Sequence, residues 1–358
     1  MKAITKLILT NIAVLLVGLL SVNFFFSIII DGVYLYNKTF VRIGQPLYRE
    51  SLPNQESAQQ IFRELRLLTK RYVPYMGWSR EPFSGVTTNV EPVHGERITP
   101  QTTNQPTKHI HFFGGSTMWG SGVDDHNTIP AHFHTLHPEY RVSNHAQSGF
   151  ISRQGLARLV NLVNQSQPMD VIVFYDGCND PLTLCRGDVS INGHREESKI
   201  IQKLEHQWAM PQNLFHSTQK AIQTIFKQGH RPPSRCDDNP DYAKTVATTL
   251  VNNWKIAKTV AAMQGADFHA ILQPVAEFGN PNISYLEEDS DGSEWNAVYP
   301  HVQHIKRQEN LTWLHDFSDA FDRKDAIYID LCHVNSLGNN IIAQKLSDVI
   351  SRIEPSSP

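Results

Sequence analysis

The sequence predicts an α/β fold in which a parallel sheet is covered by helices on both sides. From His109 onward, short apolar runs alternate with segments of helical periodicity, which is the order that builds such sheets. Residues 169–177, MDVIVFYDG, are apolar throughout their middle, as expected of a strand covered on both faces. Apolar residues make up 40% of the 358 residues and charged residues 19%, which excludes a wholly disordered chain.

The predicted elements follow one another at short intervals along the chain. Strands are expected at 109–115, 141–147, 169–177, 267–275 and near 311–317. Helices are expected at 128–138, 152–165, 241–266, about 293–309 and 336–353. One long stretch interrupts this alternation. We interpret these residues, about 181–240, as an insertion that is partly helical around 198–228.

The amino terminus carries a long apolar segment, because residues 7–30 contain no charge. As a helix this segment is about 36 Å long, enough to span a bilayer with some tilt. Lys2 and Lys6 precede it, so the positive-inside tendency predicts that the first residues stay in the cytoplasm and the rest crosses. A cleaved signal peptide and a buried core helix are the alternatives. A signal peptide has a shorter apolar region that ends in small residues, whereas this one ends in FFFSIII.

The sequence thus divides into three parts. Residues 1–30 are predicted to form a cytoplasmic tip and a transmembrane signal anchor. Residues 31–107 are an accessory or linker segment, with a helix at 57–72 and a loop-like chain from Val73 to Thr107. Residues 108–358 form the α/β domain, with the insertion at about 181–240.

Charge and motifs exclude several classes of function. The net charge is -3 and the mean hydropathy is -0.34, so neither a nucleic-acid partner nor a polytopic membrane protein is indicated. The chain has no G-x-G-x-x-G or Walker motif, so no nucleotide cofactor is expected. His132, His134 and His137 lie at helical offsets of two and five, which do not share a face, so no metal is expected either.

Polar residues follow the predicted strands at the points where each strand ends. Ser116, Gly149 and Asn179 follow the first three strands, and Asp330 and His333 lie in the sequence YIDLCHVN before the last helix. The carboxyl ends of parallel strands form one edge of the sheet, where ligands bind in open α/β folds. We therefore expect these five residues to meet at one site.

These residue types are the parts of an acyl-transfer site. A serine hydroxyl is a weak nucleophile that needs an adjacent base, and His333 can supply that base for Ser116. Asp330 can orient the imidazole ring and stabilise its charged form. The backbone N–H groups of Ser116 and Gly149 and the side chain of Asn179 can donate hydrogen bonds to the oxyanion of the tetrahedral intermediate.

Four segments carry a resemblance to a known family. FGGSTMWGSGVDD around Ser116, NHAQSG with Gly149, GCND with Asn179 and DLCH with Asp330 and His333 resemble, in this order, the signature blocks of the SGNH/GDSL hydrolases. The resemblance implies a flavodoxin-like sheet of about five parallel strands and an esterase-type site. The first block departs from the family pattern, since it reads GGST rather than GDS, and the insertion at 181–240 is a larger departure.

The four cysteines, Cys178, Cys185, Cys236 and Cys332, allow three full pairings. Because Cys178 adjoins Asn179 and Cys332 adjoins His333, one hypothesis joins these two across the site and uses Cys185 and Cys236 to tie the ends of the insertion. Four buried thiols are the alternative.

The function expected from the sequence is a membrane-anchored, extracytoplasmic serine esterase without a cofactor. Its substrate would be an acylated carbohydrate or related ester carrying a small O-acyl group such as acetyl. The periplasmic side of a bacterial inner membrane is the preferred location, and a eukaryotic secretory membrane is the alternative. An O-acyltransferase that modifies an exported polysaccharide with the same triad, and a non-catalytic envelope assembly protein, remain open as other functions.

Overall fold

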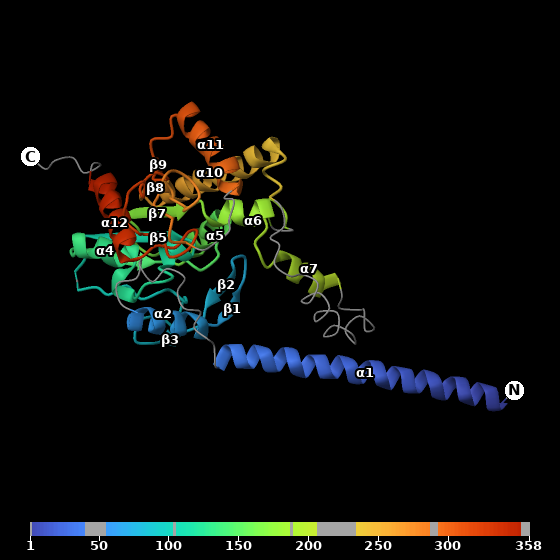
Figure 1. Cartoon of the computed structure of the whole chain (residues 1–358). Coiled ribbons are helices and arrows are strands. Elements are labelled where there is room, and N and C mark those ends of the chain that lie inside the picture. Colours follow the sequence, from blue (N-terminus) through green and yellow to red (C-terminus); the bar gives the residue numbers. More distant parts are fainter. Residues whose placement is uncertain are drawn as a thin grey trace, which may run out of the picture. The chain divides into compact units, whose positions relative to one another are not determined.

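The structure, a computed structural model, describes most of the chain, namely residues 2–39, 55–102, 105–186, 189–205, 234–286 and 293–351. The chain divides into two compact units (Figure 1). The smaller unit comprises residues 1–42 and 196–232, and the larger comprises residues 43–195 and 233–358. Residues 206–233, nearly half of the predicted insertion, lie outside the described residues, so the helix expected around 198–228 can be compared only at its start.

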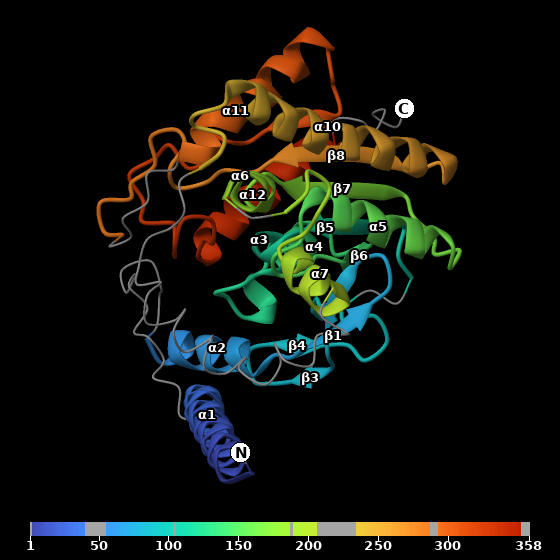
Figure 2. The same cartoon turned by 90° about the vertical axis from the view of Figure 1, so that its right-hand side faces the viewer.

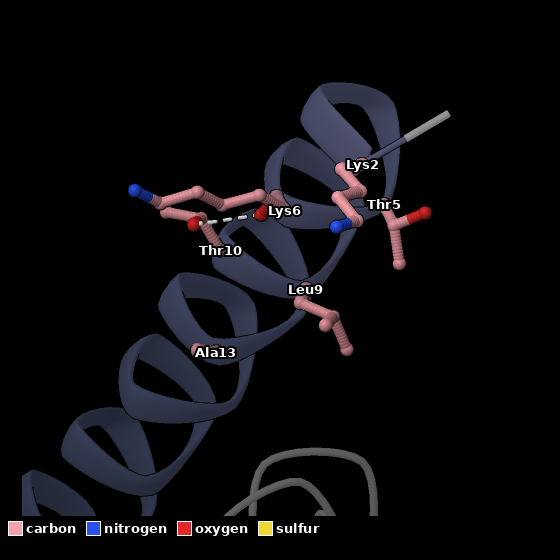
Figure 3. Close-up of a pocket in the computed structure, with 6 residues that line it drawn as sticks. All are labelled: Lys2, Thr5, Lys6, Leu9, Thr10 and Ala13. Carbon is pink, nitrogen blue, oxygen red and sulfur yellow. Dashed lines mark hydrogen bonds between the residues drawn. The ribbon is translucent and has the colours of Figure 1, made fainter.

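The smaller unit contains helix α1 (Lys2–Thr39) and helix α7 (Glu197–Glu205). The part of α1 up to Ile29 has a mean hydropathy of 2.6 and no buried residues, so it is long and apolar enough to cross a membrane. Figure 3 shows the polar side chains of its first turns, where the Thr10 hydroxyl donates a hydrogen bond to the Lys6 carbonyl at 2.9 Å. All side chains that line the hollow drawn in that figure belong to this one helix.

The centre of the larger unit is a five-stranded parallel sheet with the order β6-β5-β7-β8-β9 (Figure 1). Its strands are β5 (Lys108–Gly114), β6 (Tyr140–Asn144), β7 (Val171–Asp176), β8 (Asp267–Leu272) and β9 (Leu314–Asp316). When the five strands are numbered along the chain, their spatial order is 2-1-3-4-5, which is the flavodoxin-like order. The predicted fold class is therefore confirmed.

Helices flank this sheet in two groups. The flanking helices are α4 (Ile129–Leu136), α5 (Ser152–Val163), α10 (Pro240–Met263), α11 (Ser293–Gln308) and α12 (Ser336–Ser351). Helix α4 packs against α12, while α10 packs against both α5 and α11 (Figure 2). Two further helices, α3 (Ser116–Trp119) and α6 (Asn179–Arg186), follow β5 and β7. The 3-10 turn η2 (Asp125–Asn127) lies between α3 and α4.

Local sequence accounts for these elements. All six residues of β7 are buried, which explains its continuous apolar run. The Asn239 side chain caps the start of helix α10 by accepting a hydrogen bond from the Tyr242 N–H at 3.0 Å. Pro240 occupies the first turn, where a backbone N–H would have no acceptor within the helix, so the missing N–H of proline costs nothing. The helix ends just before Gly265, whose φ of 72° reverses the chain.

The accessory segment differs from its predicted form. The helix expected at 57–72 ends earlier, as α2 (Gln55–Leu67), because β1 (Lys70–Val73) pairs antiparallel with β2 (Gly77–Arg80). Left-handed backbone at Tyr75 and Gly77 turns the chain between these strands. The segment expected to be loop-like therefore contains β2 and a second small pair, β3 (Phe83–Ser84) and β4 (Asn89–Val90).

Buried charges join the accessory segment to the sheet domain. The Arg97 Nε donates to Asp125 Oδ1 at 2.7 Å. The guanidinium also donates to the carbonyls of Val123 and Gly120, and Gly120 is the residue that caps the end of α3. The Arg97 side chain is 0% exposed and that of Asp125 is 8% exposed. Loss of either partner would leave the other charge buried without its counter-ion.

Glu96, next to Arg97, forms a second buried link. It accepts a hydrogen bond from His145 Nδ1 at 2.5 Å and pairs with Arg158 of α5. Burial would raise the pKa of Glu96, but the charges and hydrogen bonds of His145 and Arg158 outweigh burial and lower this pKa to about 2. Residues 55–102 of the accessory segment are therefore an integral part of the larger unit.

We predict that Arg97→Ala lowers the free energy of unfolding by about 3–5 kcal/mol, because Asp125 then stays buried without its counter-ion. Denaturant unfolding of the detergent-solubilised chain measures this. The matched control is Arg141→Ala, since Arg141 is an exposed arginine on β6, and its change should stay within about 0.5 kcal/mol. An Arg97→Ala variant as stable as this control would contradict the interpretation.

Candidate active site

The five residues singled out in the sequence follow the ends of their strands or lie in the loop before α12. Ser116 begins α3 after β5, Asn179 begins α6 after β7, and Gly149 lies in the loop after β6. The order of the strands reverses between β5 and β7, and open α/β folds bind their ligands at such a point. Asp330 and His333 lie between β9 and α12.

Ser116, His333 and Asp330 form a continuous chain of hydrogen bonds. The Ser116 Oγ lies 2.7 Å from His333 Nε2, and His333 Nδ1 lies 2.6 Å from Asp330 Oδ2. The second oxygen of Asp330 accepts hydrogen bonds from the backbone N–H groups of Cys332 at 2.9 Å and His333 at 2.8 Å. The carboxylate is thus held by the same short turn that carries the imidazole, so the orientation of the ring is built into four consecutive residues.

The electrostatics keep Asp330 ionised. Burial would raise its pKa, but the charge of His333 and the hydrogen bonds from His333 and Cys332 have the larger combined effect and lower the pKa from 3.8 to about 2. A carboxyl group whose pKa is lower in the folded state than in the unfolded state stabilises the folded state at pH values above its unfolded pKa. This contribution is lost as the pH falls through about 2. Asp330 is therefore a fixed negative charge next to the imidazole at neutral pH.

The turn before Ser116 depends on glycine. A side chain at Gly114, where φ is 154°, would overlap the Tyr175 carbonyl of β7, and one at Gly115 would have to displace the Asn179 amide. Within α3, the first hydrogen bond in the helix runs from the Trp119 N–H to the Gly115 carbonyl. The N–H groups at the start of a helix have no acceptor within it, so that of Ser116 can donate to a ligand.

Asn179 and Gly149 lie next to this turn. The Asn179 Nδ2 donates one hydrogen bond to the Phe150 carbonyl at 2.8 Å, and a primary amide carries a second N–H. Gly149 has a φ of 80°, a left-handed conformation that favours glycine. The Asn179 amide therefore joins the loop of Gly149 to the turn of Ser116, with a donor left for a ligand.

Two buried carboxyl groups, those of Asp180 and Asp176, fix the loop of Asn179 to neighbouring helices. Asp180, the neighbour of Asn179, accepts hydrogen bonds from the backbone N–H and the hydroxyl of Ser152, and Asn253 of α10 donates to that hydroxyl at 2.9 Å. Burial raises the pKa of Asp180 to about 6, against the effect of its bonds to Ser152. Asp176 accepts a hydrogen bond from the Trp254 indole at 2.9 Å. The start of α6 is therefore tied to α5 and α10.

Two disulfide bonds are present. Cys178–Cys332 joins the loop of Asn179 to the loop of His333 across 154 positions of sequence. Cys185–Cys236 joins the two ends of the inserted segment across 51 positions. The first bond links two of the four loops that meet at the site, so it limits how far His333 can move from Asn179.

Three residues near the site were not singled out from the sequence. The Arg195 guanidinium packs directly against Gly149, since a Cβ built there would overlap it. The Thr117 hydroxyl, next to Ser116, donates to the Gln273 amide oxygen at 3.0 Å. Arg195 lies in an irregular loop within the insertion and carries no periodic or strand-end signal. Gln273 does directly follow β8, so the strand-end rule could have found it.

No metal centre is evident among the described residues, because no group of three or more His, Cys, Asp or Glu side chains could hold an ion there. The three histidines considered for a metal take separate partners. His132 contacts Ser336 at 3.2 Å, His134 contacts the Tyr140 carbonyl at 3.1 Å, and His137 contacts Ser347 at 2.7 Å.

Comparison with known proteins gives distant likenesses in structure. No family model and no curated protein matches the sequence. A putative arylesterase from Agrobacterium tumefaciens has 13% identity and a TM-score of 0.41, covering 69% of this chain and 100% of its own. A lipolytic protein of the G-D-S-L family from Veillonella parvula has 14% identity and a TM-score of 0.39, covering 68% and 99%. A carbohydrate acetylesterase family member from Sinorhizobium meliloti has 14% identity and a TM-score of 0.36, covering 69% and 98%.

These TM-scores are too low to assign the reaction of any of these proteins to this chain, so we infer its reaction from its own residues.

We predict that removing the Cys178–Cys332 bond destabilises the larger unit more than removing the Cys185–Cys236 bond. In the chain-entropy model, closing the longer loop contributes about 5 kcal/mol and the shorter about 4 kcal/mol. Denaturant unfolding of the two Cys→Ser double variants, each beside the wild type, measures the difference. Equal stability of all three proteins would contradict a structural role for both bonds.

Proposed function

We propose that this chain is a serine ester hydrolase of the SGNH/GDSL type, with Ser116 as nucleophile, His333 as general base and acid, and Asp330 as the residue that orients His333. The observation that carries the proposal is the hydrogen-bonded chain from Ser116 Oγ to His333 Nε2 at 2.7 Å and from His333 Nδ1 to Asp330 Oδ2 at 2.6 Å. This is the arrangement in which a nucleophile, its base and an orienting group act together.

The first half of the reaction acylates the serine. Ser116 Oγ attacks the carbonyl carbon of the ester while His333 Nε2 takes the hydroxyl proton, and the electron pair of the carbonyl moves to its oxygen. When this tetrahedral intermediate collapses, the bond to the alcohol oxygen breaks and His333 returns the proton to the leaving alcohol. In the second half, water attacks the acyl-enzyme with the same assistance, releasing the carboxylic acid and restoring Ser116.

The oxyanion of each intermediate needs donors that are already in place. Three groups support this role: the N–H of Ser116 at the start of α3, the N–H of Gly149, and the second N–H of the Asn179 amide. The hydrogen bond from Asn179 to the Phe150 carbonyl fixes the amide, so its second N–H is already in position and needs little movement to bind the oxyanion.

We further propose that α1 is a membrane anchor and that the larger unit lies outside the cytoplasm. The apolar length of α1, the positive charges of Lys2 and Lys6 before it, and two disulfide bonds in the larger unit support this placement. In that compartment, the proposed substrates are small O-acyl esters, such as acetyl esters of an envelope or exported carbohydrate.

We predict that Ser116→Ala lowers kcat for hydrolysis of 4-nitrophenyl acetate by at least about 10³-fold, because the nucleophile is lost. Asp330→Asn should lower kcat by about 10²–10⁴-fold while leaving the fold intact, since the imidazole then takes the wrong tautomer. Both are measured on the full chain in detergent. Ser121→Ala, five positions along the same loop, is the matched control and should keep the wild-type rate. Equal rates for Ser116→Ala and wild type would rule out the proposed nucleophile.

We predict that proteinase K added to intact spheroplasts of a bacterial host digests the larger unit of the full chain, because α1 carries it across the membrane. Replacing both Lys2 and Lys6 by Glu should reduce the digested fraction, since the charges that retain the amino terminus are reversed. Protection of the wild-type chain until the membrane is lysed would contradict the proposed topology.

A further inference from the structure

A group of cationic side chains next to Gly149 is not used by the proposed reaction. Lys70 of β1 lies directly opposite Arg80 of β2 in the antiparallel pair, and Trp78 lies on the same face two residues before Arg80. Like charges directly opposite each other destabilise a pair of strands. The whole chain has a net charge of -3, so this concentration of positive charge is local.

Arg195 adds a further charge to this group. Its Cζ lies 5.6 Å from the centre of the Trp78 ring, and the ring of His194 meets the same indole edge to face at 5.3 Å. Trp78 is itself fixed to the loop of Gly149, because its indole N–H donates to the Ser148 carbonyl at 3.3 Å. The Arg195 guanidinium is thus seated on a rigid aromatic side chain and against Gly149.

Arg80 contacts the short helix α3, which Ser116 begins. Its Cζ lies 5.8 Å from the centre of the Trp119 ring, and Trp119 ends the short helix that Ser116 begins. Among the described residues, the hydrogen bond of the Arg80 guanidinium is a long one of 3.3 Å, from Nη1 to the Leu68 carbonyl. Burial has the largest effect on the pKa of Arg80 and the charge of Arg195 the next largest, and together they lower this pKa to about 10. The guanidinium therefore remains charged at neutral pH.

The two guanidinium groups repel each other, and within the part of the chain that the structure describes no carboxylate forms an ion pair with either. Other arginines of the larger unit do have such partners, as Arg97 has Asp125 and Arg158 has Glu96. Arg195 is exposed to solvent, so its fork of donors is open to a ligand. An anion bound here would relieve the repulsion.

We propose that Arg195, supported by Arg80, binds an anionic group of the substrate, so that the site selects esters of acidic sugars. The inference rests on the proposed function for the identity of the neighbouring site. A guanidinium can hold either a carboxylate or a phosphate with two parallel hydrogen bonds, so the shared chemistry is an anionic oxygen group close to the scissile acyl group.

The test compares three acetyl esters that carry the acetyl group on the same hydroxyl: a methyl glucoside, a methyl glucuronoside and a glucose 6-phosphate. With the full chain in detergent, kcat/KM should be about 10-fold or more higher for at least one charged ester than for the neutral one, as expected for a charge-assisted hydrogen bond. Whichever charged ester is preferred identifies carboxylate or phosphate. The preference should fall as the ionic strength rises.

Variants of Arg195 connect this preference to the residue. Arg195→Gln should abolish the preference for the charged ester, and Arg195→Glu should reverse it by repulsion. Arg141→Gln, which removes an exposed arginine at the opposite end of the sheet strands, is the matched control and should keep the wild-type preference. Equal kcat/KM for all three esters, or an Arg195→Gln variant that slows all three by the same factor, would overturn the proposal.

A binding measurement separates failure of this proposal from failure of the esterase function. Calorimetric titration of the Ser116→Ala chain with the same three esters needs no turnover. If the wild type hydrolyses none of them, the proposed function fails. A lower Kd for a charged ester than for the neutral one, lost in the Ser116→Ala, Arg195→Gln double variant, would still support the anion site, and equal Kd values would overturn it.

Discussion

The parallel pairing of β5 with β7 is the constraint on which the candidate site depends. Its register places Gly114 opposite Tyr175, and only a residue without a Cβ can come so close to the Tyr175 carbonyl. Because the two strands run in the same direction, Ser116 and Asn179 emerge at the same edge of the sheet. The chain then leaves β5 toward β6 on one side and β7 toward β8 on the other side. The loops that follow β5 and β7 therefore diverge, and such a divergence is where open α/β sheets bind their ligands.

Side-chain contacts turn this topological arrangement into a precise one. Each loop at the edge is bound to a neighbouring loop: through the Asn179 amide to the loop of Gly149, through Asp180 to the start of α5, and through the Cys178–Cys332 bond to the loop of His333. A catalytic group is effective only when its position is fixed to within a fraction of an ångström. The supporting residues are therefore as specific to the site as the three that form the hydrogen-bonded chain.

Much of this could be predicted from the sequence, because the elements of the sheet domain carry local signals. Buried strands such as β7 are continuous apolar runs, and polar residues that directly follow them, such as Asn179, have to lie at the sheet edge. The β1–β2 hairpin could not be predicted in this way. Its first strand continues a helical pattern, and only its pairing with Gly77–Arg80 decides the outcome. Arg195 carries no local signal, because its position is set by contact with Trp78 and Gly149.

The two disulfide bonds are nested, since the pair Cys185–Cys236 lies within the loop closed by Cys178–Cys332. During synthesis, Cys178 and Cys185 leave the ribosome well before their native partners. The earliest oxidation open to the growing chain therefore joins two cysteines that the mature protein keeps apart. Where this early pair forms, reaching the native pairing requires thiol–disulfide exchange, which takes seconds to hours according to the oxidant and the isomerase present.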